Sequence, residues 1–398
     1  MVPKIDSEIG IFVYSTSFEG IGGKIKSTAD DFFVSEVLDE NVVSKISQKG
    51  DYAVYKLKKH GIDTNHALDE IFRIHGLKLK SLGLKDSNAT TEQFVCATNT
   101  RSLERFSTNR YELHRVGFVP KPLTKKDMVA NQFKIRIEGA AFSKISNFDQ
   151  LDKILNFYGY QRFGSKRPVS HLIGKAILQN DFERAVNLLL SFTSDYDLPE
   201  NTQIRKMLRG RSNYAKALKE IPPQMDLERM VLSEMVTRND PLKAIHSLPL
   251  FIRRFFIQAF QSYVFNCTLS KIFEDDEEWS SAREGDVCYD MKNKLGRYEN
   301  DPQQRLAIPI VGYAYSKKNR FDYQISKILE TEQIRPKDFF VKEMQEVSDE
   351  GGYRQVAMKC ENFSVNVPVV SFTLSRGSYA TILLREIMKP SDPIEVGF

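Results

Sequence analysis

The sequence predicts an α+β fold in which the two ends of the chain form one domain and the middle forms an inserted, mostly helical domain. The chain has 398 residues, which is enough for two or three domains. Its first and last parts alternate apolar and polar residues as strands do, whereas residues 166–270 show mainly helical patterns. We therefore expect a first part of the sheet domain in residues 1–164, the inserted domain in residues 165–345, and the rest of the sheet domain in residues 346–398.

Alternation predicts the strands of the first part. In "KIKSTADDFFVSEVL", residues 24–38, an extended segment places Phe32, Val34, Glu36 and Leu38 on one face. The stretches "EQFVCA" and "NQFKIRIEG" show the same period of two residues and are also predicted to be strands.

A helix is predicted between the first two of these strands, in "DTNHALDEIFRIHG". Asp63 or Thr64 can cap its first turn, because a short oxygen-bearing side chain accepts a hydrogen bond from a free backbone N–H. Gly76 can end the helix, because glycine readily adopts the left-handed conformation found at helix C-termini. The apolar stripe consists of Ala67, Leu68, Ile71 and Phe72.

The patterns change in the middle of the chain and change back near its end. "DFERAVNLLLSF" and "LFIRRFFIQAFQSYVFNCTLS" predict helices, and the acidic run at residues 274–278 predicts a solvated loop. Short strands are predicted in "GDVCYDM" and "LAIPIVGYAY". A strand, a break at Gly377 and a last helix are predicted in "VSFTLSRGSYATILLREIMK".

Composition argues against several classes of protein. The net charge of +5 is a mild basic excess, consistent with a polyanionic partner. The four cysteines form no CxxC pair and the six histidines form no HxH or HExxH pattern, so neither a disulfide framework nor a metal site is predicted. Neither an apolar signal segment nor an apolar run of about 18 residues is present, so we expect a soluble, cytoplasmic protein that does not contact a membrane.

One stretch is similar to a phosphate-binding loop but lacks its essential residue. "GYQRFGSK", residues 159–166, has the spacing GxxxxG. Ser165, however, stands where the lysine that contacts the phosphates is required. We therefore predict no nucleoside triphosphate site there.

Aromatic residues stand near basic or amide residues at three places: Lys26 with Phe32, Asn131 with Phe133, and Gln161 and Arg162 with Phe163. A site for an RNA base needs such a set, because the ring stacks on the base while the amide or cation binds its polar edge and the phosphate. Each pair also has a simpler explanation. Phe133 lies in an alternating strand, where an aromatic side chain commonly belongs to the core.

Residues 83–93 read "GLKDSNATTEQ" and combine a charge pair with many hydrogen-bonding side chains. The stretch is either an ordinary surface loop or a loop that positions the carboxylate of Asp86. It fills every fixed position of the signature GxKDxxAxTxQ of the TruD family of pseudouridine synthases. Further segments are similar to that family in the same order: "KSTADDFFVSE", "NQF", "NFYGYQRFG", "QAFQSYVFN", which is similar to its archaeal and eukaryotic branch, and "GSYATILLRE". The chain thus resembles this family over nearly its whole length.

The resemblance implies a fold and an activity. The expected fold is a pseudouridine synthase catalytic domain with a mixed or antiparallel sheet, interrupted by an inserted TRUD-type domain that selects the RNA. The expected reaction breaks the N1–C1′ bond of a uridine in tRNA, usually uridine 13, turns the uracil and rejoins it through C5. It needs a carboxylate but no metal and no redox cofactor. We expect a monomer that binds tRNA, with other structured RNA as a further candidate substrate.

The resemblance also implies site residues. Asp86 is the essential carboxylate, acting either as a nucleophile on C1′ or as a base at C2′. Lys85 and Lys26 are candidate cations beside it, because a nearby positive charge keeps a carboxylate ionised. The remaining placements are Asn131 near Asp86 and the substrate, Phe32 and Tyr379 at the bound nucleotide, and Phe133 beside the target base.

Other cations are candidates for contacts with the RNA backbone. The run Arg205–Lys219 contains six basic residues and no acidic one. Arg162, Arg209 and Arg211 are the specific candidates, since Lys and Arg neutralise phosphates. For each of them, ordinary solvent exposure is the simpler explanation.

Two other functions fit part of these features. A non-catalytic protein that binds structured RNA would keep the aromatic and basic residues but would not need Asp86. A glycosidase usually needs a second carboxylate and a metal nuclease needs a cluster of ligands, whereas only Asp86 is marked by its motif.

Overall fold

The computed structural model describes residues 2–83, 85, 89–99 and 102–398, and its strands form a nine-stranded sheet and a four-stranded sheet. The strands of the large sheet are β1 (Phe32–Leu38), β2 (Tyr52–Lys59), β3 (Leu79–Ser81), β4 (Thr90–Ala97), β5 (Arg105–Ser107), β6 (Tyr111–Val119), β7 (Met128–Arg136), β12 (Cys360–Asn366) and β13 (Val369–Ser375). Their order is β12-β13-β7-β1-β4-β2-β6-β5, and β3 pairs with β4.

The large sheet joins the two ends of the chain. β13 pairs antiparallel with β7, and β7 pairs antiparallel with β1. β1 and β4 run parallel, so the sheet is mixed. The predicted α+β fold with a mixed or antiparallel sheet is therefore confirmed.

The predicted alternation is present in the central strands. The buried face of β1 consists of Phe32, Val34, Glu36 and Leu38. In β7 and just beyond it, Phe133, Ile135 and Ile137 are buried as predicted. The extended segment does not begin as early as we predicted, because Ala29–Asp31 forms a 3-10 turn in which Asp31 accepts hydrogen bonds from Thr28.

The predicted helix is α3 (Thr64–His75). The Asp63 side chain caps it by accepting a hydrogen bond from the His66 backbone N–H at 3.1 Å. Gly76 ends it with a φ of +63°, the left-handed conformation that glycine adopts readily. α3 packs on β2, β4 and β6 in one apolar cluster, although Phe72 of the predicted stripe is exposed.

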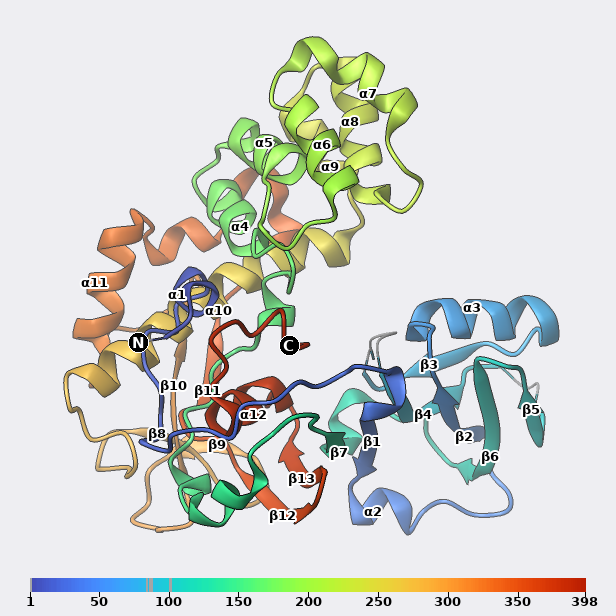
Figure 1. Cartoon of the computed structure of the whole chain (residues 1–398), viewed down its shortest axis with the longest axis vertical. Helices are drawn as coiled ribbons and strands as arrows, with labels where there is room; N and C mark the ends of the chain where they lie inside the picture. Colours follow the sequence, from blue (N-terminus) through green and yellow to red (C-terminus); the bar gives the residue numbers. More distant parts are fainter. Residues whose placement is uncertain (1, 84, 86–88, 100–101) are drawn as a thin grey trace.

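Helices dominate the middle of the chain, as predicted. They are α4 (Ser170–Leu178), α5 (Phe182–Ser191), α6 (Pro199–Met207), α7 (Tyr214–Glu220), α8 (Asp226–Arg238), α9 (Pro241–His246) and α10 (Leu250–Glu274). Figure 1 shows α4–α9 projecting upward, while the long α10 crosses the central part of the molecule. We call α6–α9 the helical unit.

The small sheet consists of β8 (Val287–Tyr289), β9 (Leu295–Arg297), β10 (Arg305–Ile310) and β11 (Gly352–Gln355), in the order β11-β10-β8-β9. β11 lies beyond residue 345, where we expected the inserted domain to end, yet it pairs with β10 inside that domain. One apolar core also includes residues from both expected domains. The limits at residues 165 and 345 stay predictions.

The last helix of the chain, α12 (Ala380–Met388), contacts the N-terminal segment. α11 (Asp322–Glu332) follows the small sheet, and α12 (Ala380–Met388) follows β13, while the short α1 (Lys4–Glu8) and α2 (Glu40–Val43) belong to the first part of the chain. Arg385 on α12 is fully buried and donates to Asp6 Oδ2 at 2.6 Å and to the Val13 carbonyl at 2.9 Å. Glu386 accepts from the Ser15 N–H at 2.9 Å. These hydrogen bonds hold the N-terminal segment against α12.

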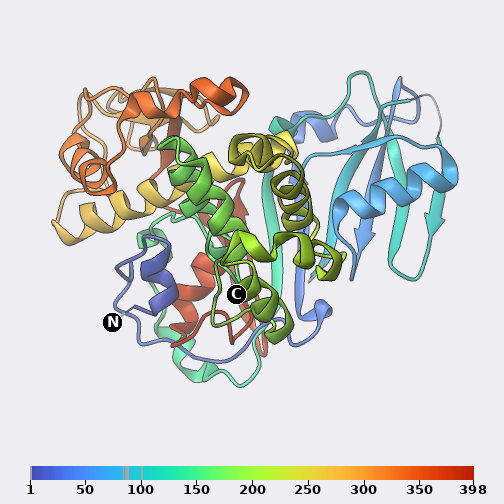
Figure 2. The same cartoon turned by 90° about the horizontal axis from the view of Figure 1, so that it is seen from above.

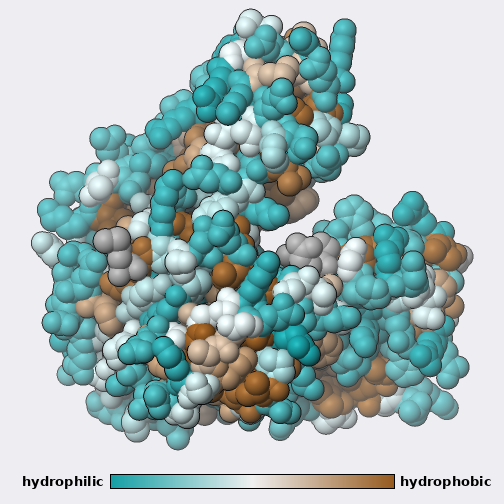
Figure 3. All heavy atoms as spheres, viewed as in Figure 1, coloured by the Kyte–Doolittle hydropathy of each residue, from teal (hydrophilic) through white to brown (hydrophobic). Residues whose placement is uncertain are grey.

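The molecule has two arms around a cleft. The unit that contains α3 and β2–β6 lies to one side of the rest in both views (Figures 1 and 2). Figure 3 shows an open cleft between this unit and the helical unit. No helix in the described part of the chain is long and apolar enough to span a membrane.

Candidate active site

One face of the large sheet carries a row of buried polar side chains. Glu36 on β1 lies opposite Asn131 on β7. Gln93 on β4 and Lys59 on β2 are buried nearby on two further strands of the sheet. We call Glu36, Asn131, Gln93 and Lys59 the polar row. Because a buried polar group is costly without a partner, these side chains need a network of contacts.

Lys85 lies over the polar row. Its Nζ donates to Asn131 Oδ1 at 2.7 Å and forms an ion pair with Glu36 Oε1 at 3.3 Å. The Lys85 side chain is 13% exposed, whereas the Glu36 side chain is fully buried. Gly83 permits this approach, since a Cβ at that position would lie 3.3 Å from Glu36 Oε1 and 3.8 Å from Lys85 Nζ.

The electrostatics of Glu36 follow from its burial. Desolvation raises the pKa of the Glu36 carboxyl above its ordinary value, because burial disfavours the charged form. The Lys85 ammonium and the Phe94 backbone N–H, which donates to Glu36 Oε2 at 2.8 Å, oppose this rise without cancelling it. The Lys85 charge is therefore directed at Glu36 and Asn131.

Hydrogen bonds hold the backbone of Lys85 as well as its side chain. Its N–H donates to Thr64 Oγ1 at 2.9 Å, and its carbonyl accepts from Lys59 Nζ at 3.2 Å. The same Thr64 hydroxyl donates to Gln93 Oε1 at 2.9 Å, and Gln93 Nε2 donates to the Gly83 carbonyl at 3.2 Å. These contacts thus hold the signature segment at its start, Gly83 and Lys85, and at its end, Gln93.

Asp86, the predicted catalytic carboxylate, lies outside the described residues. Lys85 precedes it directly and Gln93 closes the signature, and both are described. The structure therefore places Lys85, the residue directly before Asp86, against the polar row.

Three predicted residues form an aromatic and cationic group beside Asn131. The rings of Phe32 and Phe133 meet edge to face with centroids 6.1 Å apart, and Lys26 Nζ lies 4.8 Å from the Phe32 centroid. Phe372 stacks on Phe133 at 5.3 Å. Phe133 is 8% exposed, so most of its ring is packed within the protein.

Tyr379 and Arg162 both lie close to the ring of Tyr158. Tyr379 caps the start of α12, and its ring centroid lies 6.1 Å from that of Tyr158. The Arg162 guanidinium carbon lies 5.4 Å from the Tyr158 centroid. The Arg354 guanidinium carbon lies over both tyrosine rings, 4.1 Å from the centroid of Tyr158 and 6.0 Å from that of Tyr379. Such contacts between cations and rings are favourable.

The basic run of the middle segment does not reach these groups, because it belongs to the helical unit. Arg209 is exposed after α6. Arg211 forms an ion pair with Glu183 and donates to Asn239 Oδ1 at 2.6 Å. Arg205 is buried and pairs with Asp197 and Glu228. Not every cation of the run is therefore available to RNA.

Sequence reasoning did not assign Glu36 and Lys59 to the site. Both fall on the buried face of their strands by simple alternation, Glu36 between Val34 and Leu38, and Lys59 after Leu57. A charged residue on an apolar face is the signal that could have found them, because such residues are almost never buried unless they are paired.

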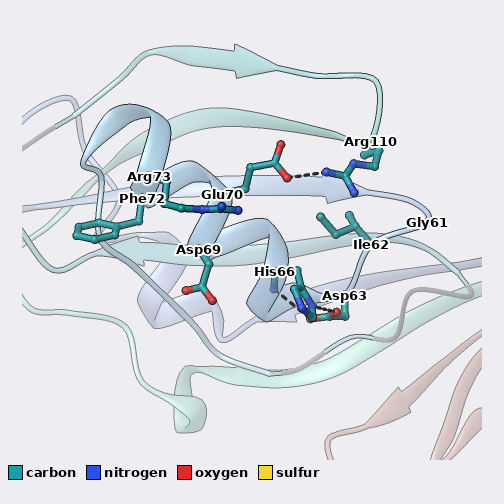
Figure 4. Close-up of a pocket in the computed structure, with 9 residues that line it drawn as sticks. All are labelled: Gly61, Ile62, Asp63, His66, Asp69, Glu70, Phe72, Arg73 and Arg110. Atoms are coloured by element: carbon teal, nitrogen blue, oxygen red, sulfur yellow. Dashed lines mark hydrogen bonds and ion pairs between the residues drawn. The ribbon is translucent and has the colours of Figure 1, made fainter. Parts of the chain in front are cut away.

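A separate pocket of about 700 Å³ lies at α3 (Figure 4). Four of its ionisable side chains form two pairs, Asp63 with His66 and Glu70 with Arg110. Asp69 and Arg73 also line the pocket, and Figure 4 draws no contact between them and the other lining residues. Among the described residues, this pocket included, no group of three or more His, Cys, Asp or Glu side chains is placed to hold a metal ion.

Comparisons with known proteins agree with this arrangement. The profile of the family described as tRNA pseudouridine synthase D (TruD) matches residues 8–387. The chain belongs to the TruD family. A relative from Pyrobaculum islandicum, named "Probable tRNA pseudouridine synthase D", is 31% identical over 100% of this chain and 99% of its own. One of the same name from Methanosarcina acetivorans is 29% identical, with 99% of each chain covered.

A solved structure supports the same assignment. The crystal structure from Methanosarcina mazei that is assigned to tRNA pseudouridine synthase D (TruD) superimposes with a TM-score of 0.77 at 26% identity, covering 99% of each chain. Membership in the TruD family makes the chain an enzyme, an isomerase that forms pseudouridine in tRNA. An RNA-binding protein without chemistry, the alternative considered from the sequence, does not fit this membership.

Proposed function

We propose that this TruD-family enzyme isomerises uridine 13 of tRNA, as a cytoplasmic monomer, with Asp86 as the essential carboxylate and without a metal or redox cofactor. One observation carries the proposal. Lys85 and Gln93, on either side of Asp86, share the Thr64 hydroxyl as a hydrogen-bond partner, and Lys85 also donates to Asn131. An ordinary surface loop would not need this anchorage, whereas a positioned carboxylate would.

The reaction is an isomerisation in which all atoms balance. The N1–C1′ bond breaks, the uracil turns, and a C5–C1′ bond forms; C5 loses its proton and N1 gains one. Asp86 either attacks C1′ and is later displaced, or removes the C2′ proton and returns it. An ordinary aspartate, with a pKa of about 3.9, is ionised at neutral pH and suits both roles.

The surrounding residues bind the uridine that leaves its stack in the RNA. Phe32, Phe133 and Tyr379 supply ring surfaces for the base and ribose. Lys85 binds the oxygen of the Asn131 amide, which directs the Asn131 NH2 group to a carbonyl of the uracil. Lys26 adds positive charge over the Phe32 ring.

The central test is the variant Asp86→Asn, which removes the charge and keeps nearly the same shape. We expect loss of pseudouridine formation by at least a thousandfold with RNA affinity within about threefold of wild type, since the carboxylate supplies nucleophilic or general-base chemistry. Single-turnover formation of pseudouridine and binding of the same tRNA transcript measure the two quantities. The control is Asp51→Asn, which changes an exposed aspartate of the same domain. If Asp86→Asn kept a tenth of the wild-type rate, the assigned role of Asp86 would be wrong.

The target uridine is tested on the RNA. Pseudouridine is mapped in a full-length tRNA transcript and in a transcript with cytidine at position 13, in the presence of a chelator. We expect one modified position in the first transcript and none in the second. Modification at another position would overturn the choice of uridine 13 and leave the reaction intact.

A further inference from the structure

A pocket of about 460 Å³ lies between the large and the small sheet. Its lining comes from the start of β7, the turn after β13, and the strands and turns of the small sheet. Four cations line it: Lys126, Lys292, Arg354 and Arg376. We call it the basic pocket.

The basic pocket carries an excess of positive charge, four cations against one carboxylate in its lining. None of its four cations forms an ion pair with a carboxylate within the described residues. Asp39 is the one carboxylate in the lining, and its Oδ1 accepts hydrogen bonds from the backbone and the side chain of Asn41 at the start of α2. The pocket is therefore suited to an anion.

Part of this charge is fixed in place. The Arg354 guanidinium donates to the Asn156 carbonyl at 3.0 Å and to Asn156 Oδ1 at 2.9 Å, and it lies over the Tyr158 ring. Arg376 donates to the Lys125 carbonyl. Lys292, by contrast, is exposed, and among the described residues it forms no ion pair. Fixed guanidinium groups with a movable lysine suit a phosphate, which accepts several charge-assisted hydrogen bonds.

The basic pocket continues the candidate active site. Val129 lines the pocket and stands two residues before Asn131 on the same strand, a separation of about 7 Å. Ser378 lines the pocket and directly precedes Tyr379, which is proposed to touch the nucleotide. An RNA strand that reaches Asn131 and Tyr379 therefore has the pocket beside it.

We propose that the basic pocket binds a phosphodiester group of the RNA strand next to the target uridine. The proposal rests on the proposed function for the identity of the RNA. Because β8, the turn after it and β11 supply part of the lining, and β8 and β11 both pair with β10, this contact also ties the small sheet to the position of the substrate strand.

The test is the double variant Lys292→Gln/Arg376→Gln, in which both changed residues are exposed, so we expect the fold to be kept. Binding of a tRNA transcript is measured at several salt concentrations, and ethylation interference locates the phosphates that contribute. Each lost phosphate contact removes about 0.7–0.9 from the slope of log K against log salt. We expect the slope to fall by about one to two, and interference to disappear at one or two phosphates close to the modified uridine.

Two controls separate local from general charge effects. Lys317→Gln/Lys318→Gln removes the same charge from an exposed loop outside the pocket and should leave the interference pattern unchanged. Arg376→Lys keeps the charge in the pocket and should keep the slope. Melting curves of all variants check that the fold is intact.

The outcomes distinguish this inference from the proposed function. An unchanged slope and an unchanged interference pattern in the pocket variant, with normal pseudouridine formation by the wild type, would overturn the pocket and leave the function standing. Interference lost only at phosphates remote from the modified uridine would also overturn it. A lost contact beside the tested uridine with no isomerisation by the wild type would support the pocket and count against the function.

Discussion

At the scale of the residue, Glu36 shows how much the stability of the fold depends on one buried carboxylate of the candidate site. Its carboxylate is fully buried and its Oε1 faces Lys85, so removing the charge leaves the ammonium without its ionic partner. Breaking a buried ion pair from one side costs about 3–5 kcal/mol. We expect Glu36→Gln to lower the free energy of unfolding by about 3 kcal/mol, measured by denaturant titration.

The neighbouring pair of Lys56 and Glu92 is the control for this prediction. Their ion pair is 2.8 Å long but the two side chains are 42% and 28% exposed. We expect Glu92→Gln to cost less than about 1 kcal/mol, because water screens exposed pairs. The double variant Glu36→Gln/Lys85→Met should recover part of the loss. Additive losses in that cycle would show that the two side chains do not interact.

Phe133 tests whether a ring serves the core or the substrate. It is 8% exposed between Phe32 and Phe372, so Phe133→Ala should cost about 3–5 kcal/mol of stability as a cavity-forming change. Phe133→Leu keeps most of the apolar volume and removes the ring. If a base stacks on the ring, we expect Phe133→Leu to lose the equivalent of about 1–3 kcal/mol in single-turnover rate while remaining folded.

The matched control is Phe372→Leu, which removes the ring on the other side of Phe133. It should lower stability in the same way without a comparable loss of rate. A normal rate for folded Phe133→Leu enzyme would assign Phe133 to the core alone.

At the scale of the residue, the sequence predicts which side chains are buried but not which of them meet. Alternation placed Glu36 on the buried face of β1, and the structure agrees. Its partner Lys85 could not be predicted from local pattern, because the contact depends on how the segment after β3 crosses the sheet. The family signature marked Lys85 without indicating that its cation is directed to Glu36.

At the scale of the element, the sequence predicted where a helix begins and ends but not how distant strands pair. α3 begins at its predicted cap and ends at Gly76, since both signals act within one helical turn. The pairing of β11 with β10 joins segments far apart in the chain, so no local pattern could predict it. The limits of the inserted domain stay uncertain from sequence for the same reason.

Helix α4 contains a titratable group whose effect on stability can be measured. His171 is buried and stacks on Tyr263 with ring centroids 5.0 Å apart. Burial lowers the pKa of His171 to about 3, with Lys175 acting in the same direction. The unfolded chain, with an ordinary histidine pKa of about 6.5, therefore binds a proton that the folded chain does not between these values.

The direction in which stability changes with pH follows from this difference in proton binding. The contribution of His171 to stability is fully present above pH 6.5 and decreases as the pH falls toward 3, by up to about 1.4 kcal/mol per pH unit for one proton. We expect His171→Phe to reduce the loss of stability between pH 6.5 and pH 4.5, measured by thermal or denaturant unfolding. His60→Gln, which changes an exposed histidine, is the control. Parallel curves for wild type and His171→Phe would contradict the assignment.

At the scale of the whole molecule, an open cleft separates the helical unit from the unit that contains α3 and β2–β6 (Figure 3). The polar row and the aromatic group belong to the large sheet, whereas Arg209 and Arg211 belong to the helical unit. If a folded RNA occupies the cleft, cations of both arms neutralise its phosphates and the salt dependence of binding reports each of them.

The two arginines should differ in this test. Arg209 is exposed and forms no ion pair within the described residues, so Arg209→Gln should reduce the slope of log K against log salt by about 0.7–0.9. Arg211 is bound to Glu183 and should contribute less, whereas Glu183→Gln frees it and should increase the slope in wild type but not in Arg211→Gln. Equal slopes for wild type, Arg209→Gln and Glu183→Gln would place the RNA away from this part of the helical unit, and the cations that bind it would then have to lie on the large and small sheets.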